Sequence, residues 1–349
     1  MNGFIMKRLR TSLFLAFLVL VLFSCGLLRT GIDINQGGAM VRQYRTVVPV
    51  DYVRNKVLVP VMVNGKKRRF IFDTGAVTVI SQTLYEEMEY PVLGRGHFYD
   101  IHKNKDTSRI VGVTSLQLGD VAFKGVPALV YDLDQVPWSC FRVDGIIGSN
   151  MLRNSSVQVS LKDSHMILSH SADGMVGEGA LRAHMRLNRQ NAPHIRMRFN
   201  GEKPEYYLFD SGSDGFVNMN REHFQELKNR MALLQKRQGH GSNVMGMIGT
   251  ANDEPVYRFK LDSMEIAGHV MSDPLIEVTS TPSQVGSQLL QYGRVTLDYS
   301  AEKFYLEPYR DSMMYQNSGS QGFGFVPVVK NDTFRVGLVW EHSLVDSLG

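Results

Sequence analysis

Two aspartates stand at the ends of apolar, strand-like runs. Asp73 is the only charged residue of FIFDTGAVTVI, and Asp210 lies in the similar stretch YYLFDSGSDGFV. A carboxylate in a buried strand would lose its water unless something compensates it. Two carboxyl groups held together share one proton, because like charges in contact strongly raise the pKa of one of them. Such a pair can supply both the base and the acid that amide hydrolysis by water requires.

The residues after each aspartate suit a tight loop. Gly75 and Gly212 let the chain turn sharply and bring backbone N–H groups near the carboxylates. Thr74 and Ser211 add a hydroxyl to each loop. The alternative is that Asp-Thr/Ser-Gly is only turn chemistry, in which the aspartate caps its own loop. That alternative does not require two copies in matched contexts.

The chain before each aspartate predicts a β-hairpin. Asn64-Gly65 and Asn200-Gly201 are hairpin signals between β-rich runs, and they precede the aspartates by nine and ten residues. Helix-like stretches follow, SQTLYEEM in the first copy and NREHFQELKNRM in the second. Each aspartate is therefore expected at the end of a hairpin's return strand, ahead of a short helix.

The self-similarity continues downstream. Gly148, in GIIGSNML, lies 75 residues after Asp73, and Gly286, in QVGSQLL, lies 76 residues after Asp210. The copies stay in register except in the middle, where the second has a longer insertion around GHGSNVMGMIGTANDEP. Two long copies indicate duplication, since a solenoid needs three or more repeats. The sequence predicts an all-β protein with homologous lobes over residues 46–170 and 180–310.

These motifs resemble the aspartic proteases of the pepsin and retropepsin type over roughly residues 46 to 310. FDTGA is closer to the retropepsin-like pattern and FDSGS fits either, whereas Gln284 stands where an apolar residue is expected. The resemblance implies two β-barrel lobes with a cleft between them. It also implies a catalytic pair of Asp73 and Asp210, and hydroxyls of Thr74 and Ser211 that tie the two loops together.

The resemblance implies an aspartic endopeptidase that takes a peptide or protein substrate. The alternative is a catalytically silent protein that binds peptides in the same cleft, because a fold can persist without its chemistry. Both need the cleft. Only the protease needs two carboxyl groups that lie close together and titrate as a pair.

Finer expectations concern the surroundings of the pair. The hydroxyl of Ser213 would stabilise an ionised Asp210, whereas Ala76 offers none, so Asp73 is expected to hold its proton more readily. The alternative is that Ala76 merely fits a tight core. Hairpin flaps cover the substrate in this family, and residues 98–110 and 244–255 are the candidates. Tyr99 would be either a flap aromatic or an exposed tyrosine at a strand edge.

The N-terminal segment predicts export. The basic stretch MKRLR precedes an apolar run, Leu13 to Phe23, that is short for a membrane span. LFSC, which ends at Cys25, resembles the lipobox of bacterial lipoproteins. It implies a signal peptide over residues 1–24, lipidation of Cys25, a tether over 25–45, and a lipid-anchored location in the bacterial cell envelope, at the periplasmic face or the cell surface. The alternative is an uncleaved short anchor.

Charge and cysteine content exclude other classes. Three of the positive charges in the formal total of +4 lie in the first 24 residues, so the remaining chain is near neutral and no nucleic-acid partner is expected. Cys25 and Cys140 are the only cysteines, too few for a disulfide framework or a cysteine metal site. The histidines lack H-x-x-x-H and H-E-x-x-H spacing. Neither a metal nor another cofactor is expected.

Residues 322–349 follow the polar link QNSGSQ and resemble the first half of a PDZ-like module. Half a module cannot close its sheet, so the natural chain is expected to continue past Gly349. The alternative is a strand pair that packs on the second lobe.

Overall fold

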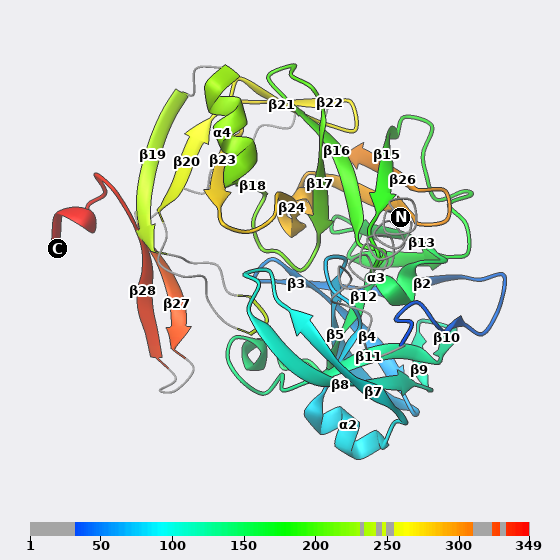
Figure 1. Ribbon diagram of the computed structural model, residues 1–349. Coiled ribbons are helices and arrows are strands. Elements are labelled where there is room, and N and C mark those ends of the chain that lie inside the picture. Colours follow the sequence, from blue (N-terminus) through cyan, green and yellow to red (C-terminus); the bar gives the residue numbers. More distant parts are fainter. Residues whose placement is uncertain are drawn as a thin grey trace, which may run out of the picture.

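The computed structural model describes residues 32–230, 234–241, 246–248, 255–309, 323–328 and 333–348. Strands predominate, which confirms the all-β class, and they build two lobes that lie one above the other in Figure 1. Helices α2 (Gln82–Met88) and α4 (Arg221–Arg230) lie at opposite ends of this view, one on each lobe. Within the described residues, no helix is both long and apolar enough to cross a membrane.

The first lobe is built on an eleven-stranded sheet and also contains α2 and two short helical turns. In chain order its elements are β1 (Gly38–Ala39), β3 (Asp51–Val53), β4 (Lys56–Val63), β5 (Lys66–Asp73), β6 (Val79–Ser81), β7 (Val92–Tyr99), β8 (Lys105–Val113), β9 (Leu116–Leu118), β10 (Val121–Lys124), β11 (Val126–Tyr131), η1 (Trp138–Phe141), β12 (Gly145–Gly148) and α3 (Ser149–Leu152).

The second lobe repeats this order. Its elements are β16 (Pro193–Phe199), β17 (Glu205–Asp210), β18 (Val217–Asn220), β19 (Leu234–Gly241), β20 (Val256–Lys260), β21 (Ser263–Ile266), β22 (His269–Ser272), β23 (Leu275–Thr279), β24 (Gln284–Gly286) and η2 (Ser287–Gln291). The pairings also repeat: β5 runs parallel to β12 as β17 does to β24, and β6 runs parallel to β11 as β18 does to β23. The predicted duplication is confirmed by this shared topology.

A six-stranded antiparallel layer joins the lobes. Its spatial order is β2 (Arg45–Pro49), β14 (His165–Ser169), β13 (Ser156–Ser160), β25 (Gly293–Asp298), β26 (Lys303–Pro308) and β15 (Leu181–Leu187). At its centre β13 pairs with β25, and the Gln158 side chain donates a hydrogen bond to Thr296 Oγ1 at 2.9 Å. The final strands of the two copies therefore form one sheet rather than two separate ones.

Local sequence explains the elements that carry the aspartates. Asn64 and Gly65 take φ of 47° and 77°, the left-handed values that a two-residue hairpin turn requires, and they join β4 to β5. The Ser81 hydroxyl caps α2 by accepting from the Leu84 N–H at 3.0 Å. Asn220 accepts in the same way from the third residue of α4. Both predicted hairpins and both predicted helices are confirmed.

Matched aromatic residues anchor the two aspartate strands in the core. Phe70 and Phe72 on β5 are fully buried, as are Tyr207 and Phe209 on β17. Because side chains alternate along a strand, these pairs point to the same side of their sheets. Burial of these large apolar side chains fixes the register of both strands. It therefore also fixes the position of the aspartate at the end of each strand.

The C-terminal strands extend the second lobe. β27 (Phe323–Val328) and β28 (Thr333–Trp340) form an antiparallel hairpin, β28 pairs with β19, and the turn η3 (Asp346–Leu348) follows. This placement agrees with the alternative of a strand pair on the second lobe. The PDZ-like continuation stays a prediction.

Candidate active site

The two aspartates occupy equivalent positions in the two lobes. Asp73 is the last residue of β5 and pairs with Gly148, while Asp210 is the last residue of β17 and pairs with Gly286. Both glycines lie against the loop that follows the aspartate. A Cβ on Gly148 would lie 2.6 Å from the Ala76 carbonyl oxygen, so no larger residue fits there. Gly148 and Gly286 therefore let their strands pack directly against the aspartate loops.

Reciprocal hydrogen bonds tie the two loops together. The Thr74 hydroxyl donates to the Phe209 carbonyl at 2.5 Å and accepts from the Ser211 N–H at 3.0 Å. The Ser211 hydroxyl donates to the Phe72 carbonyl at 2.9 Å and accepts from the Thr74 N–H at 3.0 Å. Both side chains are fully buried. These four bonds join the ends of β5 and β17 in the way the family resemblance implied.

Each aspartate is held by its own loop. Asp73 Oδ1 accepts from the backbone N–H groups of the second and third residues after it, at 2.9 and 3.0 Å. Asp210 Oδ1 accepts from the equivalent pair at 2.9 and 3.2 Å. One oxygen of each carboxyl group is thereby fixed, which orients the other oxygen.

The two carboxyl groups face each other across the junction of the lobes. A Cβ on Gly75 would lie 2.6 Å from Cγ of Asp210, and one on Gly212 would also clash with the Asp73 carboxyl. Each glycine therefore leaves room for the carboxyl group of the opposite lobe. The side chains of Asp73 and Asp210 are hydrogen-bonded to each other. The structure thus brings together every residue that the sequence singled out around the pair.

The neighbours of the pair favour Asp73 as the holder of a shared proton. Burial, followed by repulsion from Asp210, raises the pKa of Asp73 to about 8. Burial also raises the pKa of Asp210, but the Lys56 ammonium, the loop N–H groups and the hydrogen bond from Asp73 oppose that rise. A pair in which one member is protonated and the other ionised is the arrangement that acid and base work together require.

Ser213 contributes differently from what the sequence suggested. Its hydroxyl accepts a hydrogen bond from the Gln284 side-chain amide at 2.9 Å, and it is the Ser213 backbone N–H that donates to Asp210. Ala76 offers an equivalent N–H to Asp73. Gln284 is buried on β24, and the pairing of β24 with β17 stays in register at this residue. The hydrogen bond to the Ser213 hydroxyl gives the buried amide a polar partner. The polar residue in this apolar position is a partner of the loop.

A buried tyrosine supports the first loop from the second lobe. The Ser149 hydroxyl donates to the Thr74 carbonyl at 2.7 Å and lies 3.1 Å from the Tyr299 hydroxyl. Tyr299 follows β25, and burial raises its pKa further above the ordinary range. This contact crosses between the two copies, so neither motif alone indicated it.

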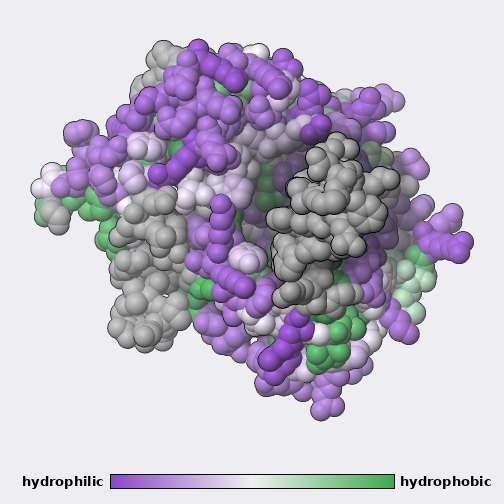
Figure 2. Space-filling model, viewed as in Figure 1, coloured by the Kyte–Doolittle hydropathy of each residue, from purple (hydrophilic) through white to green (hydrophobic). Residues whose placement is uncertain are grey.

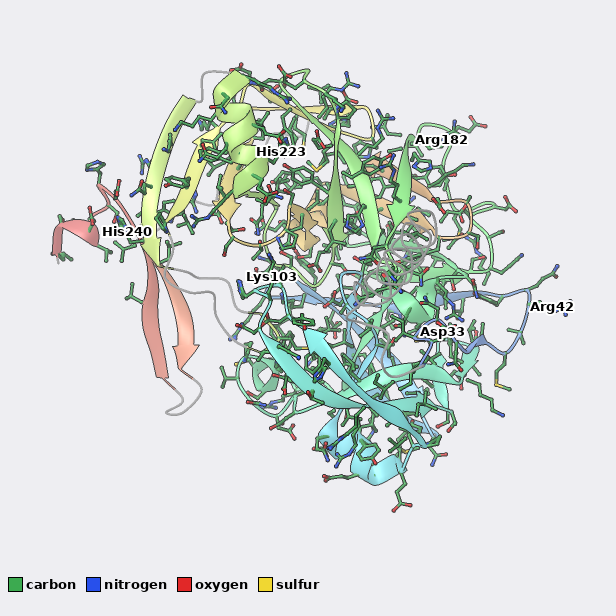
Figure 3. All side chains as sticks on the ribbon, viewed as in Figure 1. Asp33, Arg42, Lys103, Arg182, His223 and His240 are labelled. Atoms are coloured by element: carbon green, nitrogen blue, oxygen red, sulfur yellow. The ribbon has the colours of Figure 1, made fainter. Side chains whose placement is uncertain are left out.

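The two flap candidates are equivalent hairpins whose tips meet. The β7–β8 hairpin of the first lobe corresponds to β19–β20 of the second, and Figure 3 shows Lys103 at the tip of the former, toward the second lobe. Asp100 Oδ2 accepts from the Ile248 N–H at 3.1 Å, and the Tyr131 hydroxyl donates to the Met247 carbonyl at 2.6 Å. Tyr99 is 51% exposed, in agreement with an edge tyrosine. Most of residues 244–255 lie outside the described chain.

The molecular surface is hollowed between the two lobes on the face seen in Figure 2. Asp210 is 8% exposed and Asp73 somewhat more, so both side chains are largely buried but remain in contact with solvent. Sequence reasoning also missed Lys56, whose ammonium donates to the Gly212 carbonyl and acts electrostatically on both carboxyl groups. It begins a β-strand like many surface lysines, and no spacing signal marks it. Cys25 lies outside the described residues.

Comparison with known proteins agrees with the motif around Asp73. Residues 59–151 match the family model for aspartyl proteases. No curated protein sequence matches the chain. Among solved structures, the crystal structure of Basic 7S globulin from soybean is similar with a TM-score of 0.47 and 9% identity, over 76% of this chain and 95% of that chain. The part of the chain that matches the aspartyl protease family model thus includes Asp73, its loop and Gly148, and it lies within a two-lobed all-β fold.

Proposed function

We propose that this protein is an aspartic endopeptidase that hydrolyses peptide bonds with water activated by Asp73 and Asp210. The observation that carries the proposal is the pair itself: two carboxyl groups from equivalent strand ends, hydrogen-bonded to each other and fixed by reciprocal loop contacts. Turn chemistry alone would not need the glycine of each loop to make room for the carboxyl group of the other lobe.

The charge states assign the roles. Asp210, the ionised member, takes a proton from a water molecule. The oxygen of that water attacks the peptide carbonyl carbon at the same time. Asp73 gives its proton to the carbonyl oxygen, which leaves a tetrahedral diol. Asp210 then gives the proton it took from water to the amide nitrogen, and Asp73 takes a proton back from a hydroxyl of the diol. The C–N bond breaks, and an amine and a carboxylic acid are released. The preorganised loop N–H groups hold the carboxyl groups throughout and need no rearrangement.

The test compares the wild-type protein with Asp73→Asn and Asp210→Asn on fluorescently labelled, denatured casein. Each substitution should lower kcat/KM by roughly 10²–10⁴-fold, because it removes the base or the acid. The double variant should lose little more, since the two groups act as a unit. Asp214→Asn is the matched control, because this exposed aspartate lies on the same loop as Asp210.

Two results would contradict the proposal. One is an Asp73→Asn protein that cleaves casein at the wild-type rate. The other is a wild-type protein that binds casein peptides in isothermal titration calorimetry but releases no fragments, which would favour the silent peptide-binding alternative.

We further propose that the protein works at the bacterial cell envelope, anchored through a lipid on Cys25 after removal of residues 1–24. The basic start, short apolar run and LFSC motif support this placement. Its partners would be peptide or protein substrates and the membrane that holds the anchor.

A further inference from the structure

The turn between β3 and β4 reaches from the first lobe into the aspartate loop of the second. Arg54 and Asn55 form this turn with φ of 48° and 60°. Asn55 Nδ2 donates to the Asp214 carbonyl at 3.1 Å, and the Ser287 hydroxyl donates to the Asn55 carbonyl at 2.5 Å. The turn is therefore fixed to the second lobe on both sides.

Lys56 follows this turn and is partly buried. Its ammonium donates a hydrogen bond to the carbonyl of Gly212. Gly212 is the residue whose N–H donates to Asp210 and whose Cα faces the Asp73 carboxyl. A single residue, Gly212, therefore lies between the ammonium group and both carboxyl groups.

The charge of Lys56 opposes the effect of burial on the pair. It lowers the pKa of Asp73 and that of Asp210, although both remain raised. Among the described residues, Tyr299 is a further titratable group that interacts with Asp73, while the side chain of Asp214, on the same loop as Asp210, is exposed. A pair that holds one proton carries one negative charge, which an ammonium group neutralises.

We propose that Lys56 is a positioning residue that holds the Asp210 loop in place and keeps the carboxyl pair singly ionised at neutral pH. This inference rests on the proposed function. Without the positive charge, burial favours a pair with both protons, which contains no base to activate water. With it, one carboxylate stays ionised in a site that excludes most of the solvent.

The experiment separates charge from hydrogen bonding. Lys56→Gln keeps a donor for the Gly212 carbonyl but removes the charge, Lys56→Met removes both, and Lys56→Arg keeps the charge. Lys67→Met is the matched control, because Lys67 is an exposed lysine on β5. The pH profile of kcat/KM on labelled casein is measured for each variant.

Removal of the positive charge raises the pKa values of the pair, so the pH at which it becomes singly ionised rises. The acid limb of the profile should therefore move to higher pH by about one unit or more in Lys56→Gln and Lys56→Met. Lys56→Arg and Lys67→Met should keep the wild-type position. A Lys56→Gln profile that falls in height at every pH without moving would overturn the inference, since it would leave only a structural role.

A second measurement does not depend on catalysis. The carboxyl resonances of protein labelled with ¹³C-aspartate are titrated with pH, and Asp73→Asn and Asp210→Asn assign them. The titration of the pair should move to higher pH in Lys56→Gln. If that movement occurs in a protein that cleaves no casein, the proposed function fails while the role of Lys56 stands. An unmoved titration in an active enzyme overturns the role of Lys56 alone.

Discussion

At the scale of single residues, the main effect is that a carboxyl group removed from water holds its proton more strongly. Asp73 and Asp210 are buried against each other, and burial is the largest cause of the raised pKa of both. Their loop N–H groups and Lys56 oppose this cause without cancelling it. The pair is therefore a source of instability that the reciprocal hydroxyl bonds and the aromatic core beneath must offset.

This leads to a prediction on pH and stability. The folded-state pKa of Asp73 is about 8, well above the ordinary value for an unfolded aspartate, so the folded protein binds more protons between these values. Its contribution to stability is present at low pH and is lost as the pH rises toward 8. Asparagine is neutral at every pH, like the protonated carboxyl group that the folded state prefers. Asp73→Asn should therefore raise the free energy of unfolding by a few kcal/mol at pH 8 and by much less at pH 4. The gain in the free energy of unfolding is measured by chemical denaturation at both pH values.

Asp214→Asn is the matched control, because this exposed carboxyl group lies on the same loop as Asp210. Equal stabilisation by Asp73→Asn at pH 4 and pH 8 would show that Asp73 titrates normally in the folded protein.

At the scale of elements, each aspartate depends on a hairpin, a loop glycine and a parallel neighbour strand. β5 with β12 and β17 with β24 keep the same register, so both loops leave their sheets at the same height. The loops can then approach closely only because Gly75 and Gly212 have no side chains.

Gly212→Ala is therefore expected to lower activity strongly while leaving the lobes folded. The new methyl group would overlap the Asp73 carboxyl and push the pair apart, and misplacement of this size costs roughly 10²-fold in rate. Gly215→Ala lies on the same loop, but its methyl group would come no closer than 3.4 Å to other atoms. It should keep most of the activity. Casein hydrolysis and circular dichroism of both variants provide the measurement, and equal activity in the two would count against the close approach of the loops.

At the scale of the whole molecule, the N-terminal segment packs against both copies. The Asn150 side chain donates to the Ile34 carbonyl at 3.2 Å, and Asn35 donates to the Arg189 carbonyl at 3.1 Å. The tether was expected over residues 25–45, but the chain is already hydrogen-bonded to the two lobes at residues 34 and 35. The residues between Cys25 and this point would span at most roughly 25–30 Å. A lipid on Cys25 would hold the two lobes close to the membrane.

Cys25→Ser should release the protein from the membrane fraction of a bacterial host, whereas Cys140→Ser should not. Cys140 is exposed on the body and has no part in the export motif. Fractionation and intact mass of the wild-type protein, which should carry a lipid on residue 25, provide the measurement. An unmodified N-terminus at Met1 or Met6 in the membrane fraction would contradict the anchor.

Some features were determined by the sequence alone. Asn64-Gly65, the alternating apolar runs and the helix after each aspartate depend on local backbone and capping preferences, so hairpins, helices and the two-lobe repeat were predictable from short windows. The Asp-Thr/Ser-Gly motifs likewise identified the pair and its loop residues. These signals are local, and each was present twice.

Tertiary structure decided what depends on contacts between the copies. Lys56, more than 150 residues before Gly212, reaches its carbonyl only because the β3–β4 turn crosses to the second lobe. Ser213 turns its hydroxyl to Gln284, and Tyr299 meets Ser149, through pairings that no spacing in the chain encodes. The proton balance of the two aspartates follows from these neighbours and from burial. A charge or a buried hydroxyl acts over a few ångströms of space whatever its distance along the chain, so these contacts emerged only once the lobes were assembled.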